Sequence, residues 1–288
     1  MAIFTLVSAT GSPGVTTSAI GLALAWPRDV VLVDGDRCAS QAVLAGYLGG
    51  VATGGRGLTS LAQAYRDGID LTTDLPSHLV PLGEPAADGP QRRFLPGFAR
   101  PGSARLFEQV WPELLGALDD LDRQGTDVII DAGRWGSQGL PPSVIAYSRC
   151  VALVTRSSLR SLAALRLYLP DVDKAVGGAS GCFAGLFVVN PGAPYAAGEI
   201  AAQFGLPVWA EVPWQPDDAA GLSDGAQVRG RPANRPLARS FAVASAGLRV
   251  IAERWDERMT RLDGGPRAGN AVQADAEVHA EPEVGAHV

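Results

Sequence analysis

The chain has 288 residues, of which 47% are hydrophobic and 19% charged, and its net charge at pH 7 is −6. This is the composition of an ordinary globular protein, with apolar side chains for one large core or two smaller ones. The acidic balance argues against broad electrostatic binding to nucleic acid or to anionic lipid. No leader pattern precedes the first apolar run and no run is long enough to span a bilayer, so we expect a cytoplasmic protein.

The chain alternates between apolar runs of strand length and segments with helical periodicity. An apolar run begins at Ala2, and further strands are predicted at Val30–Val33, His78–Leu82, Asp127–Asp131, Cys150–Thr155, Phe183–Val189 and Pro207–Val212. Helices are predicted at Thr16–Trp26, Gln41–Leu48, Leu58–Arg66, Leu106–Asp122, Ser157–Leu169, Tyr195–Phe204 and from Leu237 to about Leu262. Glu84–Pro101, rich in Pro, Gly and Arg, is predicted to be a long surface loop.

This alternation is typical of an α/β fold, and we expect three layers with a mainly parallel central sheet flanked by helices. We expect residues 1–262 to form this domain. Residues 263–288 are acidic and nearly devoid of large apolar side chains, so we expect a disordered tail.

The loop after the first strand has the outline of a phosphate-binding loop. It reads Gly11-Ser12-Pro13-Gly14-Val15-Thr16-Thr17 and leads directly into a helix. In such loops the backbone amides and the helix N-terminus hold an anion, and the usual pattern is G-x-x-x-x-G-K-[ST]. Val15 occupies the position of the lysine. Taken alone, a Gly-Ser-Pro-Gly run is more often a plain turn.

Polar residues and a proline follow the other predicted strands. They are Asp34, Asp36, Asp131, Asn190 and Pro213. A single aspartate at a strand end is as often a helix N-cap as a ligand. Ligands of open α/β sheets, however, bind beyond the carboxyl ends of the strands, so together with the loop these residues predict a binding site.

In this order, the motifs resemble those of the MinD/ParA group of P-loop ATPases, which carry a deviant Walker A loop, K-G-G-x-G-K-T-T. The segment from Thr10 to Thr17 fits that pattern except that Thr10 stands for the signature lysine, Ser12 for a glycine and Val15 for the loop lysine. The run that ends at Asp36 resembles the second acidic motif, and the run that ends at Asp131 resembles Walker B. The resemblance spans about residues 2–260.

The resemblance implies a role for each matching residue. The amides of the Gly11–Thr17 loop hold the phosphates of ATP or ADP, the Thr16 hydroxyl binds Mg²⁺, and Thr17 contacts the α-phosphate. Asp34 and Asp131 hold the metal through water, and Asp36 orients the attacking water. Asn190 reads the adenine and the backbone at Pro213 flanks it.

The missing lysines bear on catalysis. A charge-assisted contact to phosphate contributes about 1.5–3 kcal/mol, and a transition-state cation acting like an arginine finger contributes about 10³–10⁵ in rate. Lys174 is the only lysine of the chain. Arginine can replace lysine, and the candidates near strand ends are Arg37, Arg134, Arg156 and Arg160; for each, a solvated surface position is the plainer interpretation.

The leading hypothesis is a nucleotide-binding protein of this kind with weak or absent hydrolysis, a homodimer that acts as a regulatory or positioning scaffold. Its partner would be a component of pilus or secretion-system assembly, cell division or partitioning; DNA is the less favoured partner, and so is peripheral contact with a membrane. One alternative is an active ATPase that uses arginine, with Arg134 as a catalytic candidate beside Asp36. The other is a pseudo-ATPase that binds no nucleotide. Three tryptophans near strand ends could line a partner groove, although packing is the plainer account: Trp135, Trp209 and Trp214.

Overall fold

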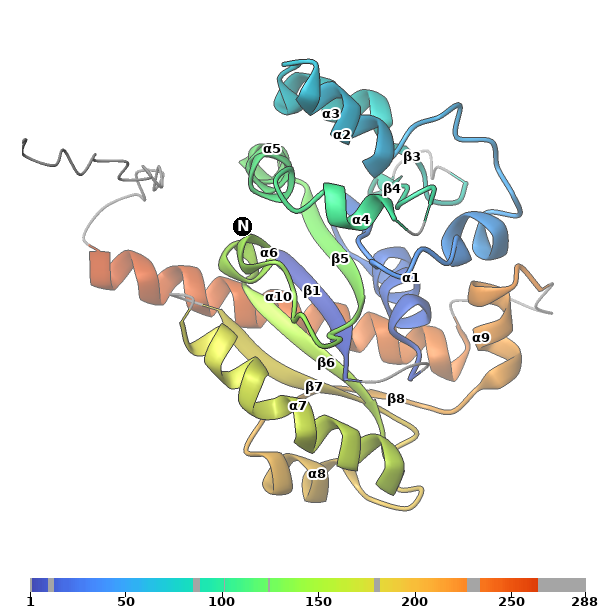
Figure 1. Ribbon diagram of the computed structural model, residues 1–288. Helices are drawn as coiled ribbons and strands as arrows, with labels where there is room; N and C mark the ends of the chain where they lie inside the picture. The colour runs from blue at the N-terminus through green and yellow to red at the C-terminus, as the bar shows by residue number, and fades with distance from the viewer. Residues whose placement is uncertain are drawn as a thin grey trace, which may run out of the picture.

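The computed structural model describes residues 2–9, 13–84, 89–100, 102–123, 125–178, 182–226 and 234–263. Eight strands form one sheet in the order β3-β4-β2-β5-β1-β6-β7-β8 (Figure 1). The strands are β1 (Ile3–Ser8), β2 (Val30–Asp34), β3 (Val80–Pro81), β4 (Arg92–Leu95), β5 (Asp127–Arg134), β6 (Cys150–Arg156), β7 (Phe183–Val189) and β8 (Val208–Val212). All neighbouring strands pair in parallel except β3, which runs antiparallel to β4 at the edge.

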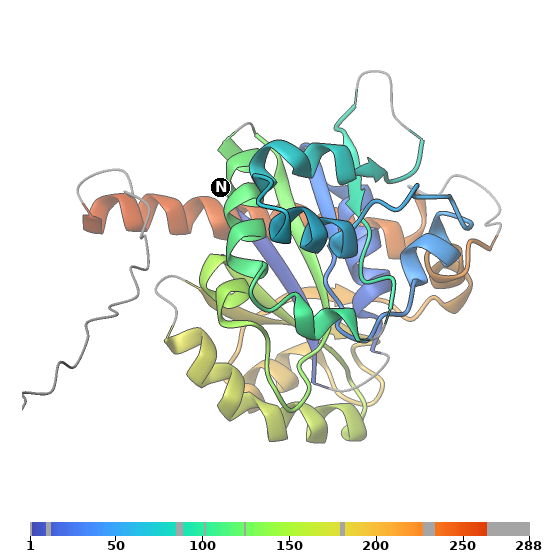
Figure 2. The same ribbon diagram turned by 45° about the horizontal axis from the view of Figure 1, so that its top comes forward.

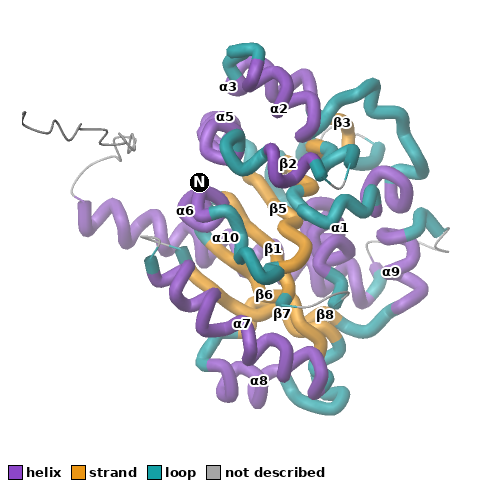
Figure 3. Tube along the Cα trace, in the orientation of Figure 1, coloured by secondary structure: helices purple, strands orange, loops and turns teal. Residues whose placement is uncertain are grey.

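Helices connect the strands and lie on both faces of the sheet (Figure 3). They are α1 (Val15–Ala25), the π-helix η1 (Ala42–Tyr47), α2 (Leu58–Arg66), α3 (Leu71–His78), α4 (Ser103–Leu106), α5 (Trp111–Arg123), α6 (Pro142–Tyr147), α7 (Leu159–Gly177), α8 (Ala197–Phe204), α9 (Pro216–Ser223) and α10 (Pro236–Asp263). In the described part of the chain, none of these helices is both long and apolar enough to cross a membrane.

Successive side chains of a strand point to opposite faces, so each central strand contributes to two cores. Ile3 and Val7 of β1 join the core that α2, α3, α5, α6, α7 and α8 cover. Phe4 and Leu6 join the core beneath α1 and α10. The near-continuous apolar strands follow from this burial on both sides. The predicted α/β fold with three layers and a mainly parallel sheet is confirmed.

Helices α1 and α10 pack directly against each other, and Figures 1 and 2 both show α10 crossing this face of the sheet as one long rod. Gly21 makes the approach possible, because a Cβ built on it would lie 2.2 Å from the ring of Phe241. The ring fills the space that any larger residue of α1 would need. The position of α1 is therefore fixed by a side chain more than two hundred residues further along the chain.

The prediction that Glu84–Pro101 is a surface loop is wrong in part, because this segment contains β4. This strand pairs along β2, with Val30 opposite Arg92 and Leu32 opposite Phe94. Its Arg-Arg-Phe-Leu sequence has no apolar alternation, and only Phe94 and Leu95 are buried. The pairing with β2 compensates for the weak local signal.

Several predicted helices differ in their bounds. The helix predicted from Leu106 begins only at Trp111, as α5, because α4 ends at Leu106 and a turn follows it. Within Gln41–Leu48 the structure has a π-helix, η1, rather than an α-helix. The helix predicted to end at Leu169 continues as α7 to Gly177 despite Pro170. The short helices α3, α6 and α9 were not predicted. The predicted tail lies outside the described residues, except for Asp263.

Candidate functional site

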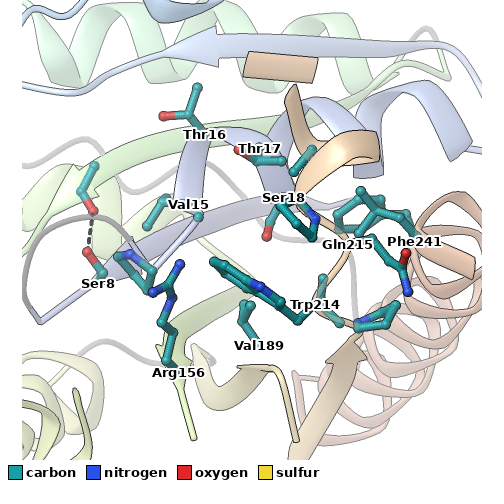
Figure 4. A pocket seen from close by; sticks show the side chains of 18 of the residues that line it. Ser8, Val15, Thr16, Thr17, Ser18, Arg156, Val189, Trp214, Gln215 and Phe241 are labelled. Carbon is teal, nitrogen blue, oxygen red and sulfur yellow. Dashed lines mark hydrogen bonds between the residues drawn. The ribbon is translucent and has the colours of Figure 1, made fainter. Parts of the chain in front are cut away.

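A cavity of about 390 Å³ opens at the carboxyl ends of the central strands. Its wall is formed by the first turn of α1, the ends of β5, β6, β7 and β8, and the start of α10. Figure 4 shows the first turn of α1 on one side of this cavity and Arg156 and Trp214 on the other. The cavity lies where ligands of open α/β sheets bind.

The N-terminus of α1 points its first backbone amides toward this cavity. Pro13, Gly14 and the first turn all line it, and no side chain of the described residues caps the helix. Gly14 has a φ of 104°, a conformation that favours glycine. Because the first amides of a helix have no partner within the helix, the turn presents free donors to an anion. Gly11 and Ser12 of the predicted loop lie outside the described residues.

Val15 is the first residue of α1 and is 6% exposed. Its side chain belongs to the core beneath α1 and also contributes to the cavity wall. Where the family pattern places an ammonium group, this chain presents an apolar surface. Thr16 and Thr17 also line the cavity.

Asp34, at the end of β2, lies beside Asp131 of β5, its register partner; β5 continues beyond the predicted end at Asp131 to Arg134. Burial, together with the negative charges of Asp131 and Asp36, raises the pKa of Asp34 to about 8, against the lowering effect of a backbone hydrogen bond from Asp36. Burial likewise raises the pKa of Asp131 to about 6, against hydrogen bonds from the Thr16 side chain and the Gly133 amide. Two adjacent buried carboxylates thus lack compensating positive charge, which is the environment that a bound cation would relieve.

Asp36 belongs to the same group and lines the cavity. Its Oδ1 accepts a hydrogen bond of 2.8 Å from the amide of Cys38. The carboxylate packs so closely on Gly133 that a Cβ there would lie 2.1 Å from Asp36 Cγ. Burial raises the pKa of Asp36, while the Cys38 amide and the charges of Arg134 and Arg37 lower it. The structure therefore brings the three predicted acids together.

The oxygen donors of this group are of the kind that Mg²⁺ prefers. Asp34 and Asp131 lie behind the cavity wall, whereas Thr16, which is hydrogen-bonded to Asp131, faces the cavity. Within the described ranges, no three His, Cys, Asp or Glu side chains are grouped to hold a metal ion on their own.

The four candidate arginines differ in what they contact. The guanidinium of Arg37 donates to the carbonyls of Trp135 and Gly139, so it secures the loop after β5. Arg134 is exposed at the end of β5 and lines the cavity near Asp36. Arg156 lines the cavity from the end of β6. Arg160 lies on α7 and lines a neighbouring hollow instead.

The two residues predicted to contact the base line adjoining spaces. Pro213 lines the main cavity. Asn190 has a φ of 61° and lies in the neighbouring hollow, where its carbonyl accepts a hydrogen bond from the Ser157 hydroxyl. Arg156 and Trp214 line both spaces and so connect them.

Trp214, Leu237 and Phe241 complete the cavity wall, although none was predicted as a site residue. Trp214 was detectable in the sequence only through its position next to Pro213. Leu237 and Phe241 carry no sequence signal beyond the helical period of α10, because their role depends on where that helix packs.

No protein-family model matches this sequence, and no curated protein matches it significantly. Solved structures do match. The septum site-determining protein MinD complexed with Mg-ADP from Pyrococcus horikoshii OT3 has a TM-score of 0.65 at 20% identity, covering 88% of this chain and 98% of that one. A ParA family ATPase from Chlorobium tepidum TLS has a TM-score of 0.63 at 16% identity, covering 85% and 98%.

A third match is the MinC:MinD cell division protein complex of Aquifex aeolicus, with a TM-score of 0.63 at 12% identity, covering 87% of this chain and 96% of that one. At these identities the likeness concerns the fold, and it extends over nearly the whole length of each protein. The chain has the fold of the MinD/ParA-like P-loop ATPases.

Proposed function

We propose that the protein binds ATP or ADP together with Mg²⁺ in the cavity at the N-terminus of α1, and that it hydrolyses ATP slowly or not at all. The observation that carries this proposal is the position of free helix amides on the cavity that Asp36 also lines, with the buried carboxylates of Asp34 and Asp131 behind its wall. Such amides suit phosphate, and the carboxylates suit the cation that accompanies it.

The residues would divide the ligand between them. The amides of the segment from Pro13 to Thr17 would hold the phosphates, with Gly11 and Ser12 extending the loop. The Thr16 hydroxyl, oriented by its hydrogen bond to Asp131, would face the Mg²⁺, and Asp34 would act through water. The cation supplies charge neutralisation to the phosphates when bound. Asp36 would hold a water molecule at the cavity wall.

Slow hydrolysis is supported by the apolar wall at Val15. Phosphoryl transfer depends on positioning and on neutralising charge in the transition state. A missing loop lysine removes a contact of about 1.5–3 kcal/mol. The remaining cations would have to supply what the two lysines supply in the family pattern.

The test is isothermal titration of the purified chain with Mg·ATP and Mg·ADP, repeated with EDTA, and a phosphate-release assay on the same samples. We expect binding that weakens on removal of Mg²⁺ and weakens again in Thr16→Ala. Thr73→Ala, an exposed change on α3, serves as the matched control. If nucleotide at millimolar concentration gives no binding heat and no thermal shift, the proposal is wrong.

An active ATPase that uses arginine is the second candidate, and the placement of Arg134 beside Asp36 favours it. Arg37 is a weaker choice, since its guanidinium already binds two carbonyls. Phosphate release that falls by an order of magnitude in Arg134→Ala, with unchanged nucleotide affinity, would favour this candidate. The pseudo-ATPase alternative is less supported, because Pro13 and Val15 line an open cavity rather than fill it.

We further propose that the chain acts as a homodimeric regulatory or positioning protein with a protein partner. The support is the shared fold with MinD and ParA proteins, among whose solved structures is a MinC:MinD cell division protein complex. Light scattering of the chain with and without Mg·ATP tests the dimer. A mass that stays monomeric under both conditions would contradict it.

A further inference from the structure

We propose that Arg156 supplies, within the same chain, the positive charge that Val15 lacks, and that Trp214 holds its guanidinium against the phosphate-binding side of the cavity. This inference rests on the proposed nucleotide binding. It names one of four candidate arginines as the cation that contacts phosphate.

The pairing of the strands places Arg156 at the edge of the sheet where α1 begins. Strand β6 is the parallel neighbour of β1, and their last register pair is Val7 with Leu153. Arg156 follows three residues later, so it lies beyond the end of β1, at the level of the loop that leads into α1. Figure 4 shows its side chain reaching into the cavity on the side that faces Val15.

The contacts of the guanidinium leave its charge available. Its Cζ lies 4.1 Å from the centroid of the Trp214 ring, which is a cation–π contact. Its Nε is buried without a hydrogen-bond partner in the described chain, and no carboxylate among the described residues pairs with it. A buried N–H donor without a partner costs free energy that a ligand oxygen would recover.

The other cations of the region are less suited. Arg37 is bound to the carbonyls of Trp135 and Gly139, and Arg134 faces the negative charge of Asp36. Arg160 lines only the neighbouring hollow. Arg156 is the cavity-lining arginine whose charge no carboxylate offsets, within the part of the chain that the structure describes.

Trp214 is a positioning residue in this arrangement. It follows β8, is 47% exposed, and presents its ring to Arg156 on the wall shared by both spaces. Stacking restricts the long arginine side chain to one side of the cavity, which reduces the conformational entropy lost when a phosphate binds. An aromatic ring of similar width, as in Trp214→Phe, should preserve part of the effect.

The experiment compares the affinities of ATP, ADP and adenosine for the full chain by calorimetry, with Mg²⁺ present. We expect Arg156→Gln, which keeps much of the stem, and Arg156→Ala to weaken ATP and ADP by about 10–100-fold. Adenosine affinity should not change, because adenosine carries no phosphate. Arg160→Ala is the matched control and should bind all three ligands as the unaltered chain does.

A charge-restoring variant makes the test independent of folding. In Val15→Lys/Arg156→Ala the loop lysine returns, and we expect ATP affinity to recover to within a few-fold of the unaltered chain. As a control that every variant is folded, the variants should unfold at similar temperatures. An unaltered chain that binds none of the three ligands overturns the proposed nucleotide binding itself. Nucleotide binding that is equal with and without Arg156, or an equal loss for adenosine, overturns the role of Arg156 alone.

Discussion

The two sides of the cavity differ in charge and in burial. On β2 and β5, Asp34 and Asp131 are almost fully buried, and their pKa values are raised because water is excluded. At the ends of β6 and β8, Arg156 and Trp214 stack on each other and are partly open to solvent. The acids of the first side belong to the motifs that resemble the family pattern, whereas Arg156 and Trp214 lie outside those motifs.

This difference indicates which part of the site can change when the loop loses its lysines. Buried carboxylates at two strand ends are fixed by register and by the backbone packed on them, such as Gly97, where a Cβ would lie 2.6 Å from Asp34 Cγ. A loop lysine, by contrast, supplies a charge at the end of a flexible stem, and an arginine from another strand can deliver that charge to the same space. We therefore expect the metal side to tolerate less change than the phosphate side.

The largest effect is expected from Gly133→Val, which breaks the acidic side. Gly133 has a φ of 63°, and a Cβ there would lie 2.1 Å from Asp36 Cγ, so the side chain both strains the backbone and displaces the carboxylate. We expect a loss of about 2–4 kcal/mol in the free energy of unfolding, measured in urea. Gly139→Val is the control, since its φ is 67° but its Cβ would have ordinary contacts at 3.6 Å or more. Equal losses in both variants would mean that the contact with Asp36 adds nothing.

Val15→Lys tests the opposite side by restoring the charge of the family pattern. The new ammonium would reach the cavity that Val15 now lines. We expect Mg·ATP to bind about 10-fold tighter or more, in line with about 1.5–3 kcal/mol for a charge-assisted contact. Val15→Met, which lengthens the side chain without charge, is the comparison in calorimetry. A similar gain in both variants would attribute the effect to packing.

The third expectation concerns the pH dependence of stability without nucleotide or Mg²⁺. The pKa of Asp34 is about 8 in the folded chain, so the folded state keeps a proton that the unfolded state releases above about pH 4. The free energy of unfolding should therefore fall as pH rises from about 4 to about 8.

Asp34→Asn should flatten this dependence above about pH 6, below which Asp131 also contributes. It should stabilise the chain at pH 8 by roughly 1 kcal/mol or more, since it removes a buried charge. Thermal unfolding across this pH range measures the effect. Asp173→Asn, an exposed change on α7, should leave the slope as it is. If the slope of the free energy of unfolding between about pH 6 and 8 is unchanged in Asp34→Asn, groups other than Asp34 cause it.

The smallest effect is expected from Trp214→Ala, which removes the ring that positions Arg156. An exposed cation–π contact contributes about 0.5–1 kcal/mol, so ADP affinity should fall only about 2- to 5-fold. In the same titration, the ADP affinity of Trp214→Phe should lie between that of the unaltered chain and that of Trp214→Ala. A loss as large as that of Arg156→Ala would give Trp214 a direct contact with the ligand.

Much of the acidic side was predictable from the sequence. Asp34 and Asp131 each follow an apolar run, and parallel strands bring their carboxyl ends to one edge of the sheet. The prediction needed only the order of motifs along the chain. It could not anticipate β4, because the side chains of Arg92 and Arg93 give no strand pattern and the pairing partner lies 62 residues earlier.

The arginine side was predictable only as a set of candidates. Arg37 and Arg156 both follow strands, and nothing in the local sequence distinguishes them. Arg37 bonds to carbonyls 98 and 102 residues away, while Arg156 stacks on a tryptophan from a strand two positions across the sheet. Likewise, Asn190 is at a strand end as expected, yet it lies in the neighbouring hollow.

The contact between Gly21 and Phe241 has a consequence for how the site is built. The amides that open toward the cavity belong to the same rigid helix as Gly21, and Phe241 both sits on that glycine and lines the cavity. The direction in which those amides point is thus inherited from α10, an element that the phosphate-loop motif does not include. A shortened chain that keeps every motif but ends before α10 would have the loop, but its amides would lose the packing that directs them toward the cavity.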